Sequence, residues 1–258
     1  MRRIALVTGG GRGIGRAIAL RLAADGLAVV AAARSLAQVE ETAASARAAD
    51  GVALAVALDV TDPASIAAAV GRVTRDLGPV DVLVNNAGVA ESAPFARTDP
   101  VLWERHFQVN VTGPYLLSRA VLPGMLERRW GRVINVASLA GLFGAPYVTA
   151  YVASKHALVG FTRALGMEVS GKGVTVNALC PGYVATDMVY RGARNIAAKT
   201  GKSFEDAVRA MAEINPGRRL IEPEEVADAA ARLITDDITN GETVVLDGTA
   251  PAPAGRPR

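Results

Sequence analysis

Short apolar runs alternate along most of the chain with longer, Ala-rich stretches of helical periodicity. The apolar runs lack the polar alternation of a half-buried strand, so they are typical of strands buried on both faces. They predict strands at residues 4–8, 29–32, 52–58, 81–84, 132–137, 174–179 and 243–246. The stretches between them predict helices at residues 13–24, 36–49, 63–77, 101–112, 114–129, 150–170 and 224–234.

This alternation predicts an α/β fold. Short joints between strands and helices imply βαβ units and a parallel sheet, and right-handed crossovers place helices on both of its faces. We therefore expect a single domain over residues 1–248, a doubly wound and Rossmann-like parallel sheet without linker or sequence repeat. Residues 249–258 are rich in Pro and Ala and predict a poorly ordered tail.

A glycine-rich turn joins the first predicted strand to the first predicted helix, with the sequence Thr8-Gly9-Gly10-Gly11-Arg12-Gly13-Ile14-Gly15. Glycines let the backbone approach a pyrophosphate, and the helix N-terminus offers free N–H groups and a partial positive charge. A flexible loop is the alternative, but the position between strand and helix favours a phosphate site. The glycine spacing is G-x-x-x-G-x-G rather than G-x-G-x-x-G.

Further short motifs follow this turn in order along the chain. They are Asp59-Val60, Asn85-Asn86-Ala87-Gly88, Asn110, Ser138, Tyr151 with Lys155, Pro181-Gly182 and Asp247-Gly248. Together with the turn, they resemble the signatures of the short-chain dehydrogenase/reductase family. Residues 150–186 are most similar to bacterial 3-oxoacyl-thioester reductases and polyketide ketoreductases. The resemblance covers nearly the whole chain and implies a nicotinamide-dependent oxidoreductase.

The end of the second predicted strand bears on the choice of cofactor. An acidic residue there binds the ribose 2′-OH of NAD, while a basic residue accommodates the 2′-phosphate of NADP. This strand ends in Ala33-Arg34 without Asp or Glu, and Arg12 lies in the glycine-rich turn. Two guanidinium groups can hold a phosphate by charge-assisted hydrogen bonds. We expect NADP(H) to be preferred over NAD(H), unless both arginines are only solvated surface residues.

The resemblance also assigns cofactor contacts to residues farther along the chain. Asp59-Val60 would reach the adenine edge, and Asn86-Ala87-Gly88 would lie beside the adenosine ribose. Pro181-Gly182 would turn beside the nicotinamide, and Val184 and Thr186 would reach its carboxamide and phosphate. Each segment also has a structural interpretation, as a polar strand end, a support for the central sheet or a simple turn.

Tyr151 and Lys155 lie four residues apart on the long predicted helix, so their side chains share one face. Reduction of a ketone leaves an alkoxide that needs a proton, and a tyrosine with the ordinary pKa of about 10 exchanges protons poorly at neutral pH. A nearby ammonium favours the phenolate, so we expect Lys155 to lower the pKa of Tyr151 and make it a usable acid or base. An exposed amphipathic pair is the alternative.

Two polar residues complete the candidate catalytic set. Ser138 follows the strand predicted at 132–137, at the sheet edge where ligands bind in open α/β folds. Its hydroxyl could hold the substrate oxygen for Tyr151, or it could be a turn serine. The resemblance implies that Asn110 holds a water linking Lys155 to solvent, while a helix asparagine bonded to backbone is the alternative. The four residues match the family tetrad.

The leading hypothesis is NADPH-dependent reduction of a ketone, such as a 3-oxoacyl thioester, to a secondary alcohol. One alternative is an NAD-dependent alcohol or 3-hydroxyacyl-CoA dehydrogenase working in the oxidative direction. Another is a non-catalytic dinucleotide sensor on the same fold. Residues near 187–215 lie where the family inserts a lid over the substrate, and a surface helix pair is the alternative there.

Composition limits the partners. The 258 residues carry a formal net charge of +3, scattered without a basic stripe, so we expect no nucleic-acid partner. The two histidines, His106 and His156, form no ligand-spaced cluster, so no metal is expected. No stretch approaches a membrane span or a signal-peptide core, which favours a cytoplasmic protein. The resemblance implies a homotetramer, although Glu242 and Thr249 depart from the usual Gln and Gly of the closing motif.

Overall fold

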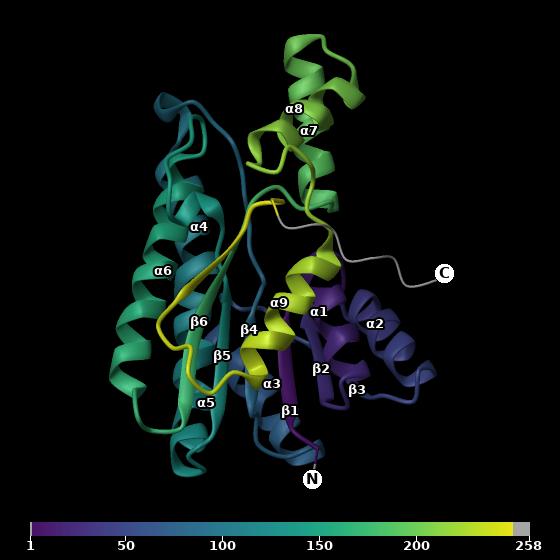
Figure 1. Cartoon of the computed structure of the whole chain (residues 1–258), viewed down its shortest axis with the longest axis vertical. Coiled ribbons are helices and arrows are strands. Elements are labelled where there is room, and N and C mark those ends of the chain that lie inside the picture. Colours follow the sequence, from purple (N-terminus) through teal and green to yellow (C-terminus); the bar gives the residue numbers. More distant parts are fainter. Residues whose placement is uncertain (1, 250–258) are drawn as a thin grey trace.

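A parallel β-sheet forms the centre of the computed structural model, which describes residues 2–249 (Figure 1). Seven strands occur within these residues, in the order β3-β2-β1-β4-β5-β6-β7. They are β1 (Ile4–Thr8), β2 (Ala28–Ala33), β3 (Val52–Ala57), β4 (Val82–Asn85), β5 (Gly131–Val136), β6 (Val174–Pro181) and β7 (Thr243–Leu246). The predicted doubly wound α/β fold is confirmed.

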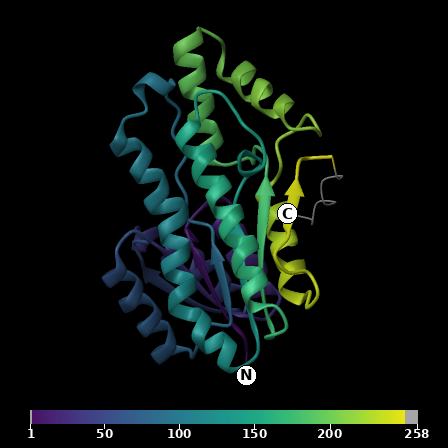
Figure 2. The same cartoon turned by 90° about the vertical axis from the view of Figure 1, so that its left-hand side faces the viewer.

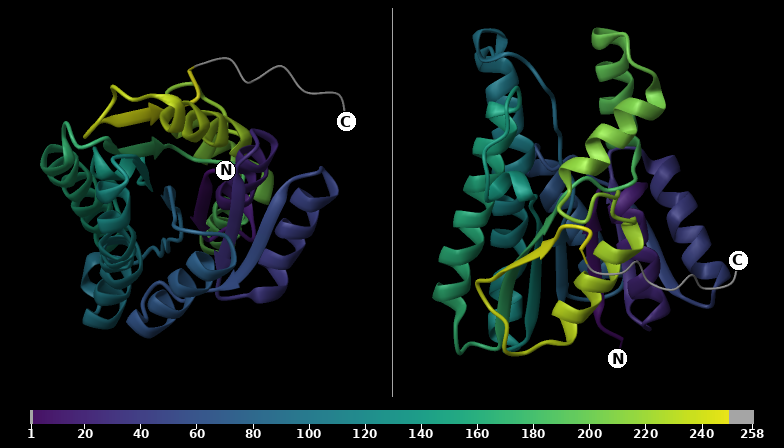
Figure 3. Two further views of the ribbon diagram at one scale, coloured as in Figure 1. Left: turned by 90° about the horizontal axis from the view of Figure 1, so that it is seen from below. Right: turned by 45° about the horizontal axis from the view of Figure 1, so that its top comes forward.

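Helices cover both faces of the sheet (Figure 3). One face carries α1 (Gly13–Ala24), α2 (Leu36–Ala48) and α9 (Pro223–Thr235). The other side carries α3 (Pro63–Asp76), α4 (Pro100–Phe107), α5 (Gly113–Glu127) and α6 (Thr149–Val169). Successive residues of β1 point to opposite faces, so Val7 joins the core under α1 and α9 while Leu6 joins the core under α3 and α5. Both faces are therefore apolar, as the uninterrupted strand patterns predict.

The helix predicted at 101–112 is an α-helix only in its first part. There α4 ends at Phe107, and the π-helical turn η2 (Gln108–Thr112) leads into α5. A side chain at Gly113 would lie 2.9 Å from the carbonyl oxygen of Val60, and Pro114 has no N–H to donate. The wider turn lets the chain pass this contact, and such turns are frequent at functional sites.

A pair of helices, α7 (Asp187–Thr200) and α8 (Phe204–Ile214), stands beyond the carboxyl ends of the strands (Figures 1 and 2). Four buried residues join the two helices in a small separate core, namely Val189, Ala193, Ala207 and Met211. The pair occupies the segment for which the resemblance implies a lid. The tail predicted at 249–258 lies outside the described residues from position 250 onward.

Candidate active site

The carboxyl ends of β1 and β4 are neighbours, and here the strand order reverses. Ligands bind at such a switch point in open α/β sheets. The Thr8 hydroxyl accepts hydrogen bonds from the backbone N–H groups of Asn86 and Ala87, each at 3.0 Å. The Asn86 side chain donates to the Thr8 carbonyl at 2.8 Å. These bonds fasten the two motifs to one another, so the structural interpretation of Asn86 holds whether or not it also contacts a ribose.

The glycine-rich turn has a shape that only glycine permits. Gly9 and Gly13 have left-handed φ values of +63° and +51°. A Cβ on Gly15 would lie 2.3 Å from the Gly9 carbonyl oxygen. No side chain caps the N-terminus of α1, which begins at Gly13, so its first N–H groups face outward from a narrow cradle. This cradle fits a pyrophosphate.

The residues expected to contact the nicotinamide half of the cofactor lie against the glycine-rich turn. A Cβ on Gly13 would lie 3.1 Å from Cγ2 of Thr186, which precedes α7. The Thr186 hydroxyl donates to the Val184 carbonyl at 3.2 Å, and Val184 is buried. Pro181 ends β6, and Gly182 donates its N–H to Leu246 at 2.8 Å.

The two arginines expected to select the cofactor are exposed at this edge of the sheet. Arg34 follows β2, and its charge contributes to a lowered pKa of Asp59, whose main cause is hydrogen bonding from Thr61. Arg34 and Asp59 therefore lie near one another at the ends of adjacent strands. Val60 is buried beneath Gly113, which favours a packing role for that residue.

Three of the four candidate catalytic side chains come from α6 and the end of β5. Ser138 directly follows β5, and its hydroxyl accepts a hydrogen bond from Ala140 N–H at 3.1 Å. Tyr151 and Lys155 lie on α6, with the Lys155 Nζ 5.8 Å from the centroid of the Tyr151 ring. Lys155 is buried and donates from Nζ to the Val136 carbonyl at 2.8 Å. The last residue of β5 thus holds the ammonium below the tyrosine.

Asn110 is the fourth member and lies in the π-helical turn η2. Its amide exchanges two hydrogen bonds with the backbone of Val89, at 2.9 and 3.0 Å, and donates to the Ser154 hydroxyl at 2.9 Å. A Cβ on Gly88 would lie 3.3 Å from Asn110 Oδ1 and 3.7 Å from Lys155 Nζ. The end of β4, the π-helical turn and α6 therefore meet at one point, and the four predicted side chains gather there.

The expected effect of Lys155 on Tyr151 is wrong for this structure. Burial raises the pKa of Tyr151, and the hydrogen bond with Ser138 offsets this only in part. Burial lowers the pKa of Lys155 to about 8. Withdrawal from water is the largest cause of both shifts, because desolvation disfavours each charged form, and Lys155 is not among the causes of the Tyr151 shift. Tyr151 is held protonated at neutral pH, which suits a proton donor.

Sequence reasoning gave no role to His106, which is fully buried beside the candidate catalytic residue Tyr151. Its Nε2 accepts from the Glu91 N–H at 3.1 Å, so Nδ1 carries the proton and donates to the Leu102 carbonyl at 2.8 Å. The His106 and Tyr151 rings meet edge to face, with centroids 6.4 Å apart. The sequence did not indicate this contact, because His106 and Tyr151 lie on different helices, α4 and α6.

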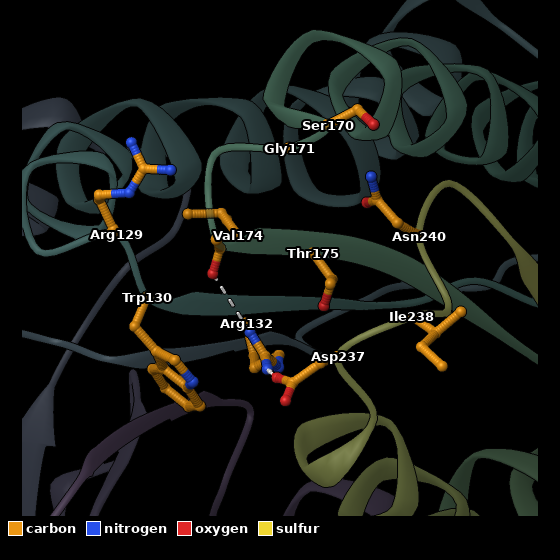
Figure 4. Close-up of a pocket in the computed structure, with 11 residues that line it drawn as sticks. Arg129, Trp130, Arg132, Ser170, Gly171, Val174, Thr175, Asp237, Ile238 and Asn240 are labelled. Atoms are coloured by element: carbon orange, nitrogen blue, oxygen red, sulfur yellow. Dashed lines mark hydrogen bonds and ion pairs between the residues drawn. The ribbon is translucent and has the colours of Figure 1, made fainter.

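Two cavities lie at the opposite, amino-terminal edge of the sheet. Their volumes are about 480 and 430 Å³, and both are lined by Trp130, Arg132 and Asp237. Arg132 is buried, its guanidinium lies 4.4 Å from the Trp130 ring centroid, and it pairs with the exposed Asp237 (Figure 4). Neither cavity touches the candidate catalytic residues, so this edge is separate from the site.

The chain belongs to the short chain dehydrogenase family, whose model matches residues 3–196. It is 38% identical over 250 residues to an acetoacetyl-CoA reductase of Shinella zoogloeoides, covering 96% of this chain and 98% of the relative. It is 37% identical over 254 residues to the 3-oxoacyl-[acyl-carrier-protein] reductase FabG of Escherichia coli, covering 95% and 96%. A solved actinorhodin polyketide ketoreductase with NADPH superposes with a TM-score of 0.92 at 38% identity, covering 96% of each chain.

These findings confirm the resemblance and make the chain an oxidoreductase of this family. Within residues 2–249, no helix is long and apolar enough to cross a membrane. The same residues hold no group of three or more His, Cys, Asp or Glu side chains placed to bind a metal ion.

Proposed function

We propose that the protein reduces a ketone, in particular a 3-oxoacyl thioester, to a secondary alcohol with NADPH. The gathering of Ser138, Tyr151 and Lys155 around the ends of β4 and β5, next to the switch point, carries this proposal. Relatives named as acetoacetyl-CoA and 3-oxoacyl-carrier-protein reductases support the thioester class.

Each residue has a defined task in this reaction. NADPH, when bound, supplies the hydride to the carbonyl carbon. The Ser138 hydroxyl holds the carbonyl oxygen, and the Tyr151 phenol donates its proton to that oxygen as charge develops on it. Lys155, beneath Tyr151, stabilises the phenolate that remains. Asn110 keeps the turn at Val89 and helix α6 in place beside Lys155, where a proton can be returned from solvent.

The residues of the cofactor cradle favour NADPH over NADH. Arg34 and Arg12 supply positive charge where β2 and the glycine-rich turn end, and no acidic residue ends β2. The ketoreductase structure that superposes on this chain is described with NADPH. Segments 86–88 and 181–186 border the same edge, and we assign them the ribose and nicotinamide contacts. The pair α7–α8 would close over the substrate as a lid.

The test follows the absorbance of the reduced nicotinamide with NADPH and, separately, NADH, against ketones and 3-oxoacyl thioesters. We expect faster turnover with NADPH and a loss of about 10²-fold or more in kcat for Tyr151→Phe. Tyr115→Phe is the matched control, because Tyr115 lies exposed on α5 outside the candidate site, and this variant should keep full activity. Preference for NADH and for the alcohol would favour the NAD-dependent dehydrogenase, while nucleotide binding without any turnover would favour a sensor.

A further inference from the structure

The loop that follows β4 is anchored to helix α4 at Glu91. The Glu91 N–H donates to Nε2 of His106 at 3.1 Å, and the Glu91 carboxylate pairs with Arg105 at 2.8 Å. Two residues later, the Ala93 N–H donates to the Tyr147 carbonyl at 2.8 Å. Because this loop leaves the sheet at its carboxyl edge, where ligands bind, these bonds hold one side of the candidate site in place.

The imidazole of His106 is held in one orientation. The residue is fully buried, and its two ring nitrogens have different partners. Nε2 accepts from the Glu91 N–H, while Nδ1 donates to the Leu102 carbonyl at 2.8 Å. These partners set the neutral tautomer with the proton on Nδ1, because a backbone N–H can bond only to an unprotonated ring nitrogen. The plane of the ring is therefore fixed at two points.

This fixed ring lies against the ring of Tyr151. The centroids of the two rings are 6.4 Å apart, and their planes are inclined by 72°. Edge-to-face pairs are favourable beyond the apolar area that they bury, because the positive edge of one ring meets the negative face of the other. His106 belongs to α4 and Tyr151 to α6, which lie side by side (Figure 1). The contact thus supports Tyr151 from outside its own helix.

The position of the Tyr151 hydroxyl depends on how the ring is held, because the hydroxyl lies at the far end of the side chain. The Tyr151 carbonyl accepts a hydrogen bond from the Ser154 hydroxyl at 2.8 Å, and this bond restrains only the main chain. A small rotation of the ring would still carry the hydroxyl away from a substrate oxygen. A misplacement of reacting atoms by about 1 Å can cost about 10²-fold in rate.

We propose that His106 is a positioning residue for the proton transfer and acts through Tyr151. Its hydrogen bonds to Glu91 and Leu102 fix the imidazole, and the imidazole in turn holds the Tyr151 ring so that the phenol points at the carbonyl oxygen of the substrate. The residue does this without reaching the substrate, since its side chain is fully buried. This inference rests on the proposed function, in which Tyr151 donates the proton.

Two substitutions at position 106 separate the ring contact from the hydrogen bond. In His106→Phe an aromatic ring still packs on Tyr151, but nothing accepts from the Glu91 N–H. In His106→Gln the side-chain carbonyl can accept from that N–H, but no ring remains. The assay is the NADPH-dependent reduction of acetoacetyl-CoA, a 3-oxoacyl thioester, at saturating NADPH.

We expect His106→Gln to lower kcat about tenfold with little change in KM, because the phenol is misplaced while the substrate still binds. His106→Phe should keep kcat close to that of the wild type, because the retained ring rescues the position of Tyr151. His156→Gln is the matched control and should change neither value. His156 also donates to or accepts from the carbonyl four residues earlier, that of Val152, at 3.0 Å, but it is exposed.

The pattern of kcat separates a positioning role from a purely structural one. If His106→Phe and His106→Gln lower kcat by the same factor, or if neither lowers it, the ring of His106 does not position Tyr151. A purely structural role would lower the melting temperature of both variants and leave kcat of the folded protein unchanged. If the wild-type protein reduces no ketone or thioester at all, the proposed function fails and the role of His106 fails with it.

Nuclear magnetic resonance of the wild-type protein with ¹⁵N-labelled histidine gives a test that needs no variant at position 106 to fold. We expect His106 to be neutral with its proton on Nδ1, and we expect the signals of its ring to shift in Tyr151→Leu, which removes the neighbouring ring. A proton on Nε2, or ring signals that do not shift, would overturn the proposal.

Discussion

At the scale of single residues, Lys155 carries the largest electrostatic cost in the site. Only 5% of the residue is exposed, and its single described hydrogen bond goes to the Val136 carbonyl. A buried ammonium without a carboxylate partner is unfavourable, which is why its pKa falls to about 8. In the proposed reaction, a positive charge below Tyr151 would stabilise the phenolate, which gives this unfavourable position a use.

This cost predicts a pH dependence of stability. Lys155 has a pKa of 10.5 when unperturbed and about 8 in the fold. Between these values the unfolded chain binds a proton that the folded chain has released, so this group makes the free energy of unfolding rise with pH. Lys155→Met removes the titration, and the variant should be more stable by about 3 kcal/mol at about pH 7. The advantage should shrink as the pH rises from about 8 toward 10.5.

Urea denaturation of both proteins without nucleotide, at about pH 7 and about pH 9.5, measures this difference. Comparison with the variant at each pH cancels groups that Lys155 does not influence, such as Tyr183, whose raised pKa acts in the opposite direction. An advantage of Lys155→Met that stays constant between the two pH values would mean that Lys155 does not titrate as described.

Arg34 and Arg12 give a second prediction at this scale. Arg34→Ala and Arg12→Ala should each weaken NADPH binding about tenfold, through loss of a charge-assisted hydrogen bond to the 2′-phosphate. Binding of NADH, which lacks that phosphate, should change little. Arg72→Ala, on α3, is the matched control. Fluorescence titration with both nucleotides decides the matter, and an equal loss for NADH would assign the arginines a general structural role.

The sequence predicts the members of the site better than it predicts their electrostatics. Four-residue spacing places Tyr151 and Lys155 on one helix face, and the structure keeps them there. The pKa direction of Tyr151 came out wrong because it depends on burial, which spacing does not reveal. His106 was missed for a similar reason, since its contact with Tyr151 joins two helices, α4 and α6, that lie far apart in the sequence.

At the scale of elements, the glycine-rich turn makes the sharpest prediction. Gly15→Ala would place a Cβ 2.3 Å from the Gly9 carbonyl oxygen, so the turn must open. We expect lower thermal stability and a loss of NADPH binding. Gly71→Ala on α3 is the matched control, because no atom lies within 4 Å of its Cβ. The control should raise stability by about 0.5–1 kcal/mol, as alanine favours a helix over glycine.

Calorimetry and nucleotide titration of the two glycine variants measure both effects. A Gly15→Ala protein that binds NADPH as tightly as the wild type would show that the cradle is not the phosphate site. Equal stability changes for the two variants would show that the close contact between residue 15 and the Gly9 carbonyl oxygen does not affect the free energy of unfolding.

Among the elements, sequence patterns predict the strands and the helices that cover the sheet better than they predict the remaining segments. Strands and sheet-covering helices follow from apolar runs and helical periodicity, since both reflect burial against one regular sheet. The helices α7 and α8 pack mainly on each other, so their apolar stripe is narrow and the sequence predicted only a lid or surface pair. The π-helical turn η2 lies beside the contact between Gly113 and Val60, and no local sequence pattern predicted it because these two residues are far apart in the sequence.

At the scale of the whole molecule, β7 forms an edge of the sheet. Val245 of this strand is 47% exposed, and Ile238, in the segment before it, is 92% exposed. An open edge with apolar side chains is a template for pairing with another chain. These features support the expectation that the protein is a homo-oligomer, with β7 at a contact between copies.

Light scattering during size-exclusion chromatography tests this expectation. We expect an assembly for the wild-type protein, and a shift toward the monomer for Val245→Asp, because the contact would then bury an unpaired charge. Leu36→Asp is the matched control: Leu36 is also half exposed, but it begins α2, where an acidic residue suits the helix N-terminus. A wild-type monomer would contradict the family expectation. An assembly that Val245→Asp leaves intact would place the contact between copies elsewhere on the protein. Glu242 and Thr249, which replace the usual Gln and Gly of the closing motif, would then indicate that the copies pack differently from those of the family.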